Sequence, residues 1–179
     1  MTLTESQSQV LQKQSTMPQF SLKDTNGGII NTPTNELVLI VFMCNHCPYV
    51  IAKLDELNRI ASDFTEKLTV IGINSNNNPD YPQDSYEKMQ EMVANGDIKF
   101  TYVLDEDQSV AKLFGAACTP DPFLFHDGKL IFHSRIANPP GTGDITDSEM
   151  YEAISEFLEK GSISAGEKPS MGCNIKWVK

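Results

Sequence analysis

Residues 38–49 read Val-Leu-Ile-Val-Phe-Met-Cys-Asn-His-Cys-Pro-Tyr, and this stretch decides how the chain folds. An apolar run long enough for a buried strand ends at Cys44 and Cys47, in the spacing C-x-x-C. Pro48 follows and begins a pattern of helical period. This order places two thiols at a helix N-terminus, where unpaired N–H groups and the helix dipole stabilise a thiolate. The stretch therefore predicts reactive sulfur chemistry at the end of a strand.

The flanking sequence places this stretch in a βαβ unit. From Val50 to Phe64, apolar residues recur at three- and four-residue spacing, which predicts one helix of about five turns. Residues 36–43 are apolar on both faces, and residues 68–74 form a second apolar run. Both runs are expected to be buried strands of a parallel sheet, joined by a right-handed crossover.

The rest of the chain predicts a hairpin before this unit and alternating elements after it. We expect residues 1–17 to form a flexible arm, residues 18–161 one domain, and residues 162–179 an irregular tail packed on that domain. The other expected elements are a hairpin over 20–30, a helix from a capping box at 84–87, a strand over 100–104, a short helix over 110–114, strands over 123–125 and 130–135, and a helix from a capping box at 146–149 to Gly161.

Composition excludes several classes of function. The 179 residues carry a net charge of −10, which argues against nucleic acid or an anionic membrane as partner. Four cysteines are too few for a disulfide-stapled scaffold. The polar residues 1–14 lack the pattern of a secretory signal, so we expect a cytoplasmic protein. Its expected partners are protein or small-molecule thiols and disulfides, with no cofactor and no metal; the oligomeric state stays open.

The two cysteines favour redox chemistry over a structural metal site, which would need four ligands at recognisable spacing. Cys44 is expected to be the exposed nucleophile, and Cys47 the resolving thiol that closes a disulfide. His46 is expected to favour the Cys44 thiolate and make the couple more oxidising, unless it is simply an exposed loop histidine. Cys118 and Cys173 are expected to be buried small apolar residues.

Thr119 and Pro120 form the candidate cis-proline site, with Pro122 as a rival. A cis bond there would turn the preceding backbone toward the dithiol and offer an edge with which a substrate backbone can pair.

Two motifs carry a resemblance to a known family. Residues 42–50 (Phe-Met-Cys-Asn-His-Cys-Pro-Tyr-Val) and residues 169–177 (Pro-Ser-Met-Gly-Cys-Asn-Ile-Lys-Trp) resemble the thioredoxin superfamily, with Thr119-Pro120 before Phe-Leu-Phe. Within it, they are similar to a bacterial group of redoxin-domain proteins. That group is related to the peroxiredoxins (AhpC/TSA-like) and to the thiol-disulfide oxidoreductases of cytochrome maturation. The resemblance covers nearly everything after residue 17.

The resemblance implies a thioredoxin-like α/β fold of three layers, α/β/α, with a mixed central sheet, an N-terminal β-hairpin and an extra helix. It also implies that Cys44 and Cys47 are the redox pair and that Pro120 is the cis-proline. Thioredoxins carry a buried Asp six residues before the first cysteine. Because that position is Val38 here, another base, or water, is expected to serve.

Three functions remain open at this point. The first is a thiol-disulfide oxidoreductase in which Cys44 attacks and Cys47 resolves. The second is a thiol peroxidase with Cys47 as the peroxidatic cysteine, although Cys44 stands where peroxiredoxins have Thr or Ser. The third is a copper carrier that uses Cys44, Cys47 and a histidine, although such carriers usually space their cysteines C-x-x-x-C.

Overall fold

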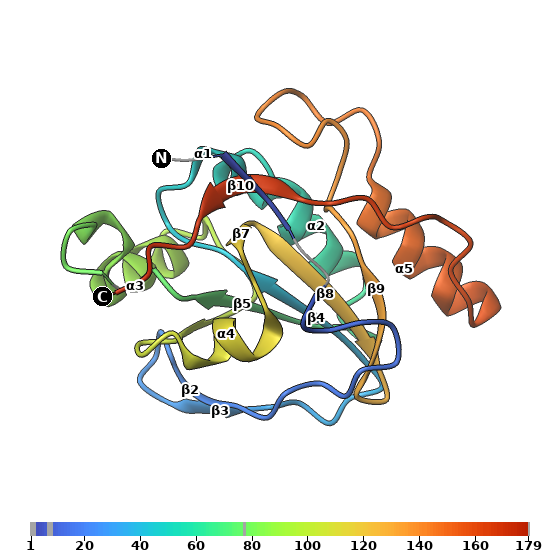
Figure 1. The fold of residues 1–179 in the computed structure, drawn as a ribbon, viewed down its shortest axis with the longest axis horizontal. Coiled ribbons are helices and arrows are strands. Elements are labelled where there is room, and N and C mark those ends of the chain that lie inside the picture. The colour runs from blue at the N-terminus through green and yellow to red at the C-terminus, as the bar shows by residue number, and fades with distance from the viewer. Residues whose placement is uncertain (1–2, 7–8, 77, 179) are drawn as a thin grey trace.

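The structure, a computed structural model, describes residues 3–6, 9–76 and 78–178. Strands and helices alternate along most of this chain (Figure 1). The elements are β1 (Leu3–Glu5), β2 (Ser21–Asp24), β3 (Ile29–Asn31), β4 (Leu37–Phe42), α1 (Pro48–Ile51), α2 (Leu54–Asp63), β5 (Thr69–Asn74), the 3-10 helix η1 (Pro82–Asp84), α3 (Tyr86–Ala94), β6 (Thr101–Leu104), α4 (Ser109–Phe114), β7 (Cys118–Thr119), β8 (Asp121–His126), β9 (Lys129–His133), α5 (Glu149–Lys160) and β10 (Met171–Asn174).

A seven-stranded mixed sheet forms the centre of the molecule, in the order β3-β2-β6-β5-β4-β8-β9 (Figure 1). Strands β4, β5 and β6 are parallel to one another. Strands β2, β8 and β9 run antiparallel to their neighbours, and β2 and β3 form a hairpin. The predicted βαβ unit, mixed sheet and N-terminal hairpin are therefore confirmed.

Strand β4 is buried along its whole length, and its side chains alternate between two apolar cores. One core lies between the sheet and helices α2, α3 and α5, and the other between the sheet, α4 and the N-terminal segment. Both faces of the sheet are covered, which confirms the predicted three-layer arrangement. The β4 residues of the first core are Leu37, Leu39 and Val41, and those of the second are Val38, Ile40 and Phe42.

The helix after the dithiol differs from the prediction, because it consists of α1 and α2 rather than one piece. Lys53, between them, has φ −116° and ψ 0°, outside the helical region. Its N–H bonds to the Val50 carbonyl at the tighter i→i+3 spacing. Val50, Leu54 and Leu57 all pack into one core across this turn, so the apolar periodicity gives no sign of the break.

Two predicted capping boxes are also wrong in detail. Helix α3 is capped by Ser85, whose side chain accepts a hydrogen bond from the Lys88 N–H, rather than by Asp84. Helix α5 begins after Ser148, and the Thr146 hydroxyl bonds to the carbonyl of Asn138 instead. In both places the expected capping residue has a partner outside its own helix.

The terminal segments form a second sheet of three strands, in the order β1-β10-β7 (Figure 1). The predicted flexible arm over residues 1–17 is therefore wrong for its described part, in which β1 pairs with β10 and both Leu11 and Met17 are buried. The predicted irregular tail is wrong at β10. Residues 1–2, 7–8 and 179 of these segments lie outside the described residues, and the boundaries after residues 17 and 161 stay predictions.

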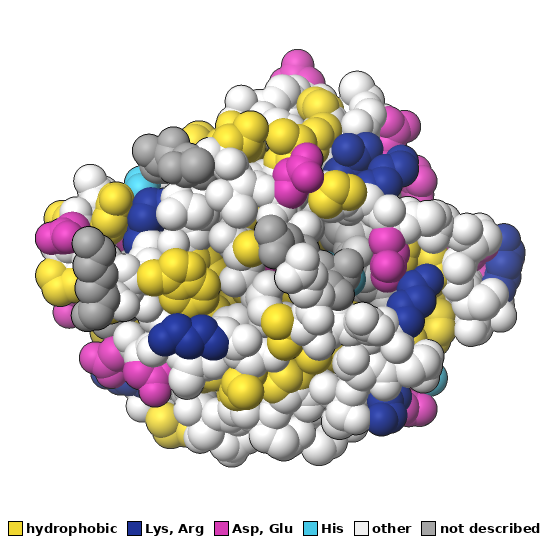
Figure 2. Space-filling view, in the orientation of Figure 1, with side chains coloured by type: hydrophobic (Ala, Val, Ile, Leu, Met, Phe, Trp, Pro, Cys, Tyr) yellow, Lys and Arg dark blue, Asp and Glu magenta, His cyan; other side chains and the backbone are white. Residues whose placement is uncertain are grey.

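The surface matches the acidic composition. On the face shown in Figure 2, the basic side chains of the described residues form small separate groups among acidic and apolar ones. No helix of the described chain has the length and apolar character needed to cross a bilayer.

Candidate active site

The dithiol lies in the loop between β4 and α1, and it is closed to solvent. Cys47 is the N-cap residue of α1, and both Cys44 and Cys47 have no exposed surface. Strand β7 lies directly against them: the Cys44 Sγ is 3.5 Å from the Thr119 Oγ1, and the Cys47 Sγ is 3.2 Å from the Thr119 carbonyl oxygen. The expectation that Cys44 is the exposed cysteine is therefore wrong, because β7 and its neighbour β10 cover the loop.

Thr119 and Pro120 lie where the sequence predicted them, beside the dithiol. Their peptide bond is cis, and Pro122, the rival, does not follow a cis bond. The backbone edge of β7 is paired with β10, so that Thr119 lies opposite Cys173. This edge was expected to receive a substrate backbone, and here the C-terminal strand of the same chain occupies it.

Cys47 has the lower pKa of the two thiols. A hydrogen bond from the Cys44 thiol lowers the pKa of Cys47 to about 5, against the opposing effect of burial. Contacts with the side chains of Cys173 and Thr119 and with the backbone of Val50 also lower this pKa. The surroundings of Cys47 therefore favour its thiolate form.

Cys44 has the higher pKa of the pair. Its hydrogen bond to Cys47 raises the pKa of Cys44 well above its usual value, and burial and the negative charge of Asp84 act in the same direction. The contact between the two thiols therefore makes Cys47 the more acidic partner of the pair. These directions oppose the expectation that Cys44 forms the thiolate, and the catalytic roles of the two cysteines stay predictions.

Asp84 is a site residue that the sequence reasoning missed. Its side chain is buried, and its carboxylate accepts hydrogen bonds from the backbone N–H of Asn45 and of His46, at 2.9 and 3.1 Å. The Asn76 side chain donates a third, at 3.2 Å. Asp84 lies in η1, which follows the carboxyl end of β5. Strand β5 is parallel to β4, and ligand-binding loops commonly lie at the carboxyl ends of parallel strands. This rule could have indicated Asp84 from the sequence.

His46 lies in the loop but does not act on Cys44 as predicted. Its Nδ1 is 2.8 Å from the Asp84 Oδ2, an ion-pair distance without hydrogen-bond geometry. The ring is also stacked on Tyr81, with ring centroids 6.0 Å apart. Asp84 also lies close to Cys44, so the three side chains form one polar cluster. In this cluster His46 contacts the carboxylate of Asp84, and the charge of that carboxylate acts on the Cys44 thiol.

Hydrogen bonds hold the loop in place between the two cysteines. The Asn45 Oδ1 accepts a bond from the Tyr102 hydroxyl at 2.9 Å, and its Nδ2 donates to the carbonyls of Gln83 and Ser85. Burial raises the pKa of Tyr102 well above its usual value, so the hydroxyl remains a donor. The loop is therefore fixed to β6 and to the segment that carries Asp84.

A metal site in this cluster has a poor donor set for copper. The ligand atoms of Cys44, His46 and Asp84 lie within 4.8 Å of one another, but Cys47 is not part of the group. Cu(I) prefers thiolate and thioether ligands, and the buried carboxylate is already used by backbone N–H groups. The expected copper set of two cysteines and a histidine is therefore not assembled by the described residues.

The remaining two cysteines differ from each other. Burial raises the pKa of Cys118 strongly, and its sulfur points toward the Pro120 carbonyl, 3.8 Å away. This fits the predicted inert, buried residue. Cys173 lies instead with its Sγ 3.0 Å from the Cys47 Sγ, within the site itself.

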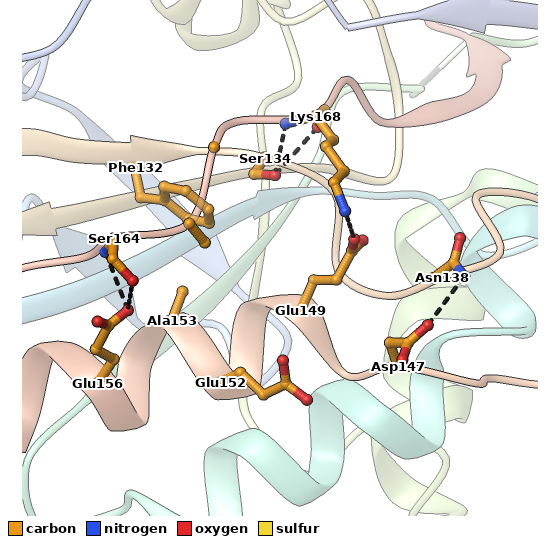
Figure 3. A pocket seen from close by; sticks show the side chains of 12 residues that line it. Phe132, Ser134, Asn138, Asp147, Glu149, Glu152, Ala153, Glu156, Ser164 and Lys168 are labelled. Atoms are coloured by element: carbon orange, nitrogen blue, oxygen red, sulfur yellow. Dashed lines mark hydrogen bonds and ion pairs between the residues drawn. The ribbon is translucent and has the colours of Figure 1, made fainter.

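A separate pocket of about 540 Å³ lies between α5 and the segments before and after it (Figure 3). Two of its acidic side chains have partners: Glu149 is 2.5 Å from the Lys168 Nζ, and Glu156 accepts hydrogen bonds from Ser164. None of the residues lining this pocket belongs to the dithiol site, so it does not bear on the sulfur chemistry.

Comparison with known proteins places the chain in a family. The model of the AhpC/TSA family matches residues 14–133, which is more than half of the chain. The chain belongs to the AhpC/TSA family. A buried dithiol is consistent with membership of this family of redox enzymes. The resemblance stated from the sequence is confirmed. No curated protein matches the sequence significantly.

Solved structures agree with this placement. An uncharacterized conserved protein from Geobacillus kaustophilus is 33% identical, with a TM-score of 0.90 over 99% of this chain and 97% of that one. A hypothetical protein from Sinorhizobium meliloti 1021 is 32% identical, with a TM-score of 0.89 over 98% of each chain. The thioredoxin domain of a thiol-disulfide oxidoreductase from Bacteroides vulgatus is 15% identical, with a TM-score of 0.65 over 83% of this chain and 99% of that one. The thioredoxin-like fold is therefore confirmed.

Proposed function

We propose that the chain is a thiol-disulfide oxidoreductase in which Cys47 attacks and Cys44 resolves. The feature that supports this most is the opposite shift of the two pKa values, because the contact between the thiols lowers the pKa of Cys47 and raises that of Cys44. A thiolate is the attacking form in disulfide exchange, and a second thiol in contact with it can close the intramolecular disulfide.

The proposed reaction has two exchange steps. The Cys47 thiolate attacks one sulfur of a substrate disulfide; a mixed disulfide forms, and the other substrate sulfur leaves as a thiolate. Cys44 then loses its proton and attacks the Cys47 sulfur, which releases the second substrate thiolate and leaves a Cys44–Cys47 disulfide. The substrate gains two electrons, and the protein loses two.

Asp84 is the proposed acceptor of the Cys44 proton. Its carboxylate lies beside the thiol, and the Nδ1 of the partly exposed His46 is 2.8 Å from the Asp84 Oδ2. A proton can therefore pass from Cys44 to Asp84 and then through His46 toward solvent. In this role Asp84 replaces the buried acid that is absent at Val38.

A thiol peroxidase is the second candidate, and the lowered pKa of Cys47 favours it, because a peroxidatic cysteine must also be a thiolate. Two features favour the oxidoreductase. The groups that lower the pKa of Cys47 are all neutral hydrogen-bond donors, with no cationic side chain among them to polarise a peroxide. Cys44 also occupies the place of the Thr or Ser that peroxiredoxins use.

A single-turnover experiment separates the two candidates. Reduced protein is mixed rapidly with either hydroxyethyl disulfide or hydrogen peroxide, and the product thiol and the state of each cysteine are measured. We expect two product thiols for each protein molecule from the disulfide, with a Cys44–Cys47 disulfide, and a peroxide reaction no faster than that of an ordinary thiolate. Fast peroxide consumption that survives Cys44→Ser but not Cys47→Ser would overturn the proposal in favour of the peroxidase.

A further inference from the structure

We propose that Cys173 is a third redox-active thiol, which accepts the Cys47 sulfur from the Cys44–Cys47 disulfide and forms a Cys47–Cys173 disulfide. This inference rests on the proposed oxidoreductase function. It assigns a chemical role to the C-terminal strand, which otherwise only covers the site.

The sulfur atoms are already in position for this exchange. The Sγ atoms of Cys47 and Cys173 are 3.0 Å apart, although the two residues are 126 positions apart in the sequence. Cys173 lies opposite Thr119 in the pairing of β10 with β7, beside the dithiol. Strand β10 therefore presents a thiol to Cys47 in the way that a substrate strand paired with this edge would present its own sulfur.

Gly172 shows that β10 is fitted closely to this edge. A Cβ atom at this position would lie 1.9 Å from the Thr119 carbonyl oxygen and 2.7 Å from the Thr119 carbonyl carbon. Any other residue would hold β10 away from β7, so glycine is required for the approach that brings Cys173 to Cys47.

The segment after β10 is also anchored. The Lys176 N–H donates to the Asn76 Oδ1 at 2.9 Å, and the Gln108 Nε2 donates to the Lys176 carbonyl at 2.9 Å. The Val178 N–H then donates to the Gln108 Oε1 at 2.8 Å. With β1 paired on its other edge, β10 is fixed from both sides, and its sulfur stays at the site.

The exchange is balanced within the protein. Cys173 loses its proton and attacks the Cys47 sulfur; the Cys44–Cys47 bond breaks, the Cys47–Cys173 bond forms, and Cys44 leaves and takes up a proton. No electrons are gained or lost, because the substrate disulfide has already supplied the oxidation. In the reduced state, burial and the contact with Cys47 raise the pKa of Cys173 to about 12. Oxidation of Cys47 removes the part of this rise that comes from the contact with Cys47. The Cys173 thiol therefore ionises more readily in the oxidised protein, in which the exchange takes place.

The test is disulfide mapping after oxidation with hydroxyethyl disulfide, acid quenching and alkylation. Cleavage after Lys or Arg leaves Cys44 and Cys47 on one peptide and Cys173 on another, so a cross-linked pair of peptides reports the new bond. We expect this pair in the wild-type protein and in Cys44→Ser, where only Cys47 can form it. It should be absent in Cys173→Ser and unchanged in the matched control Cys118→Ser.

Each outcome of the mapping has a distinct meaning. If Cys173 is fully alkylated in oxidised wild-type protein and Cys44→Ser gives no cross-link, the inference is overturned, while a Cys44–Cys47 disulfide would leave the proposed function intact. If no disulfide and no product thiol form at all, the proposed function itself fails. Gly172→Ala should abolish the cross-link and keep the Cys44–Cys47 disulfide; an undiminished cross-link would contradict the close packing of β10 on which the inference rests.

Discussion

Replacing Cys47 by serine should lower the turnover of a disulfide substrate by on the order of a thousandfold or more, because the variant loses the attacking thiolate. A serine hydroxyl stays protonated at neutral pH and forms no sulfur–sulfur bond. The measurement is steady-state reduction of a protein disulfide with dithiothreitol as electron donor. In the same assay Cys118→Ser, which changes a buried thiol whose sulfur is directed at the Pro120 carbonyl, should keep near wild-type turnover.

The Cys44→Ser variant tests the order of the two steps. Its hydroxyl can still donate a hydrogen bond to Cys47, so the first attack should proceed. The second step is blocked, and a mixed disulfide with the substrate should accumulate on Cys47 or be released by Cys173. A mixed disulfide that accumulates instead on Cys44 in Cys47→Ser would show that the order predicted from the sequence is correct and that our assignment is wrong.

Replacing Asp84 by asparagine should slow the resolving step by about a hundredfold or more, which is the usual contribution of a general base. Asparagine keeps a carbonyl oxygen for the N–H groups of Asn45 and His46, so the loop should stay in place. It cannot accept the Cys44 proton. The negative charge of Asp84 raises the pKa of Cys44, so this pKa should fall in the variant. The decay of the mixed disulfide is measured by rapid quenching. In the variant its rate should depend on hydroxide and increase as the pH rises.

Asp105→Asn is the matched control for this variant. Asp105 is another buried carboxylate that accepts backbone hydrogen bonds, from Val110 and Ala111 at the start of α4. Its replacement should affect stability without changing the resolving step. An unchanged resolving rate in Asp84→Asn, or an equal loss in Asp105→Asn, would rule out Asp84 as the proton acceptor.

The sequence was sufficient to predict the sheet and the dithiol, because each has a strong local signal. An apolar run covered on both faces predicts a central strand, and C-x-x-C followed by proline predicts thiols at a helix start. Thr119-Pro120 was recognisable only because the resemblance supplied the fold context. These predictions concern residues whose roles follow from their near neighbours in the chain.

The features that were missed depend on contacts between distant segments. Strand β10 is four residues long and contains a glycine, so it shows no alternation that would predict a strand. Its contact with Cys47 depends on the meeting of the two terminal segments with β7, which no local pattern encodes. Asp84 was interpreted as a helix cap because its neighbours form a capping motif, whereas its carboxylate turns away from α3 toward the loop of the dithiol.

The reduction potential of the site, measured against pH, tests the central claim most directly. The protein is equilibrated with dithiothreitol redox buffers, and its thiols are counted at each pH. If Cys47 is a thiolate with a pKa of about 5 and Cys44 remains protonated, oxidation above pH 5 releases one proton for two electrons. The potential should then fall by about 30 mV per pH unit from pH 6 to 8, rather than by about 59 mV. A slope of about 59 mV through neutral pH, or the absence of any two-electron couple, would contradict the assignment of Cys47 as the resting thiolate of a redox-active pair.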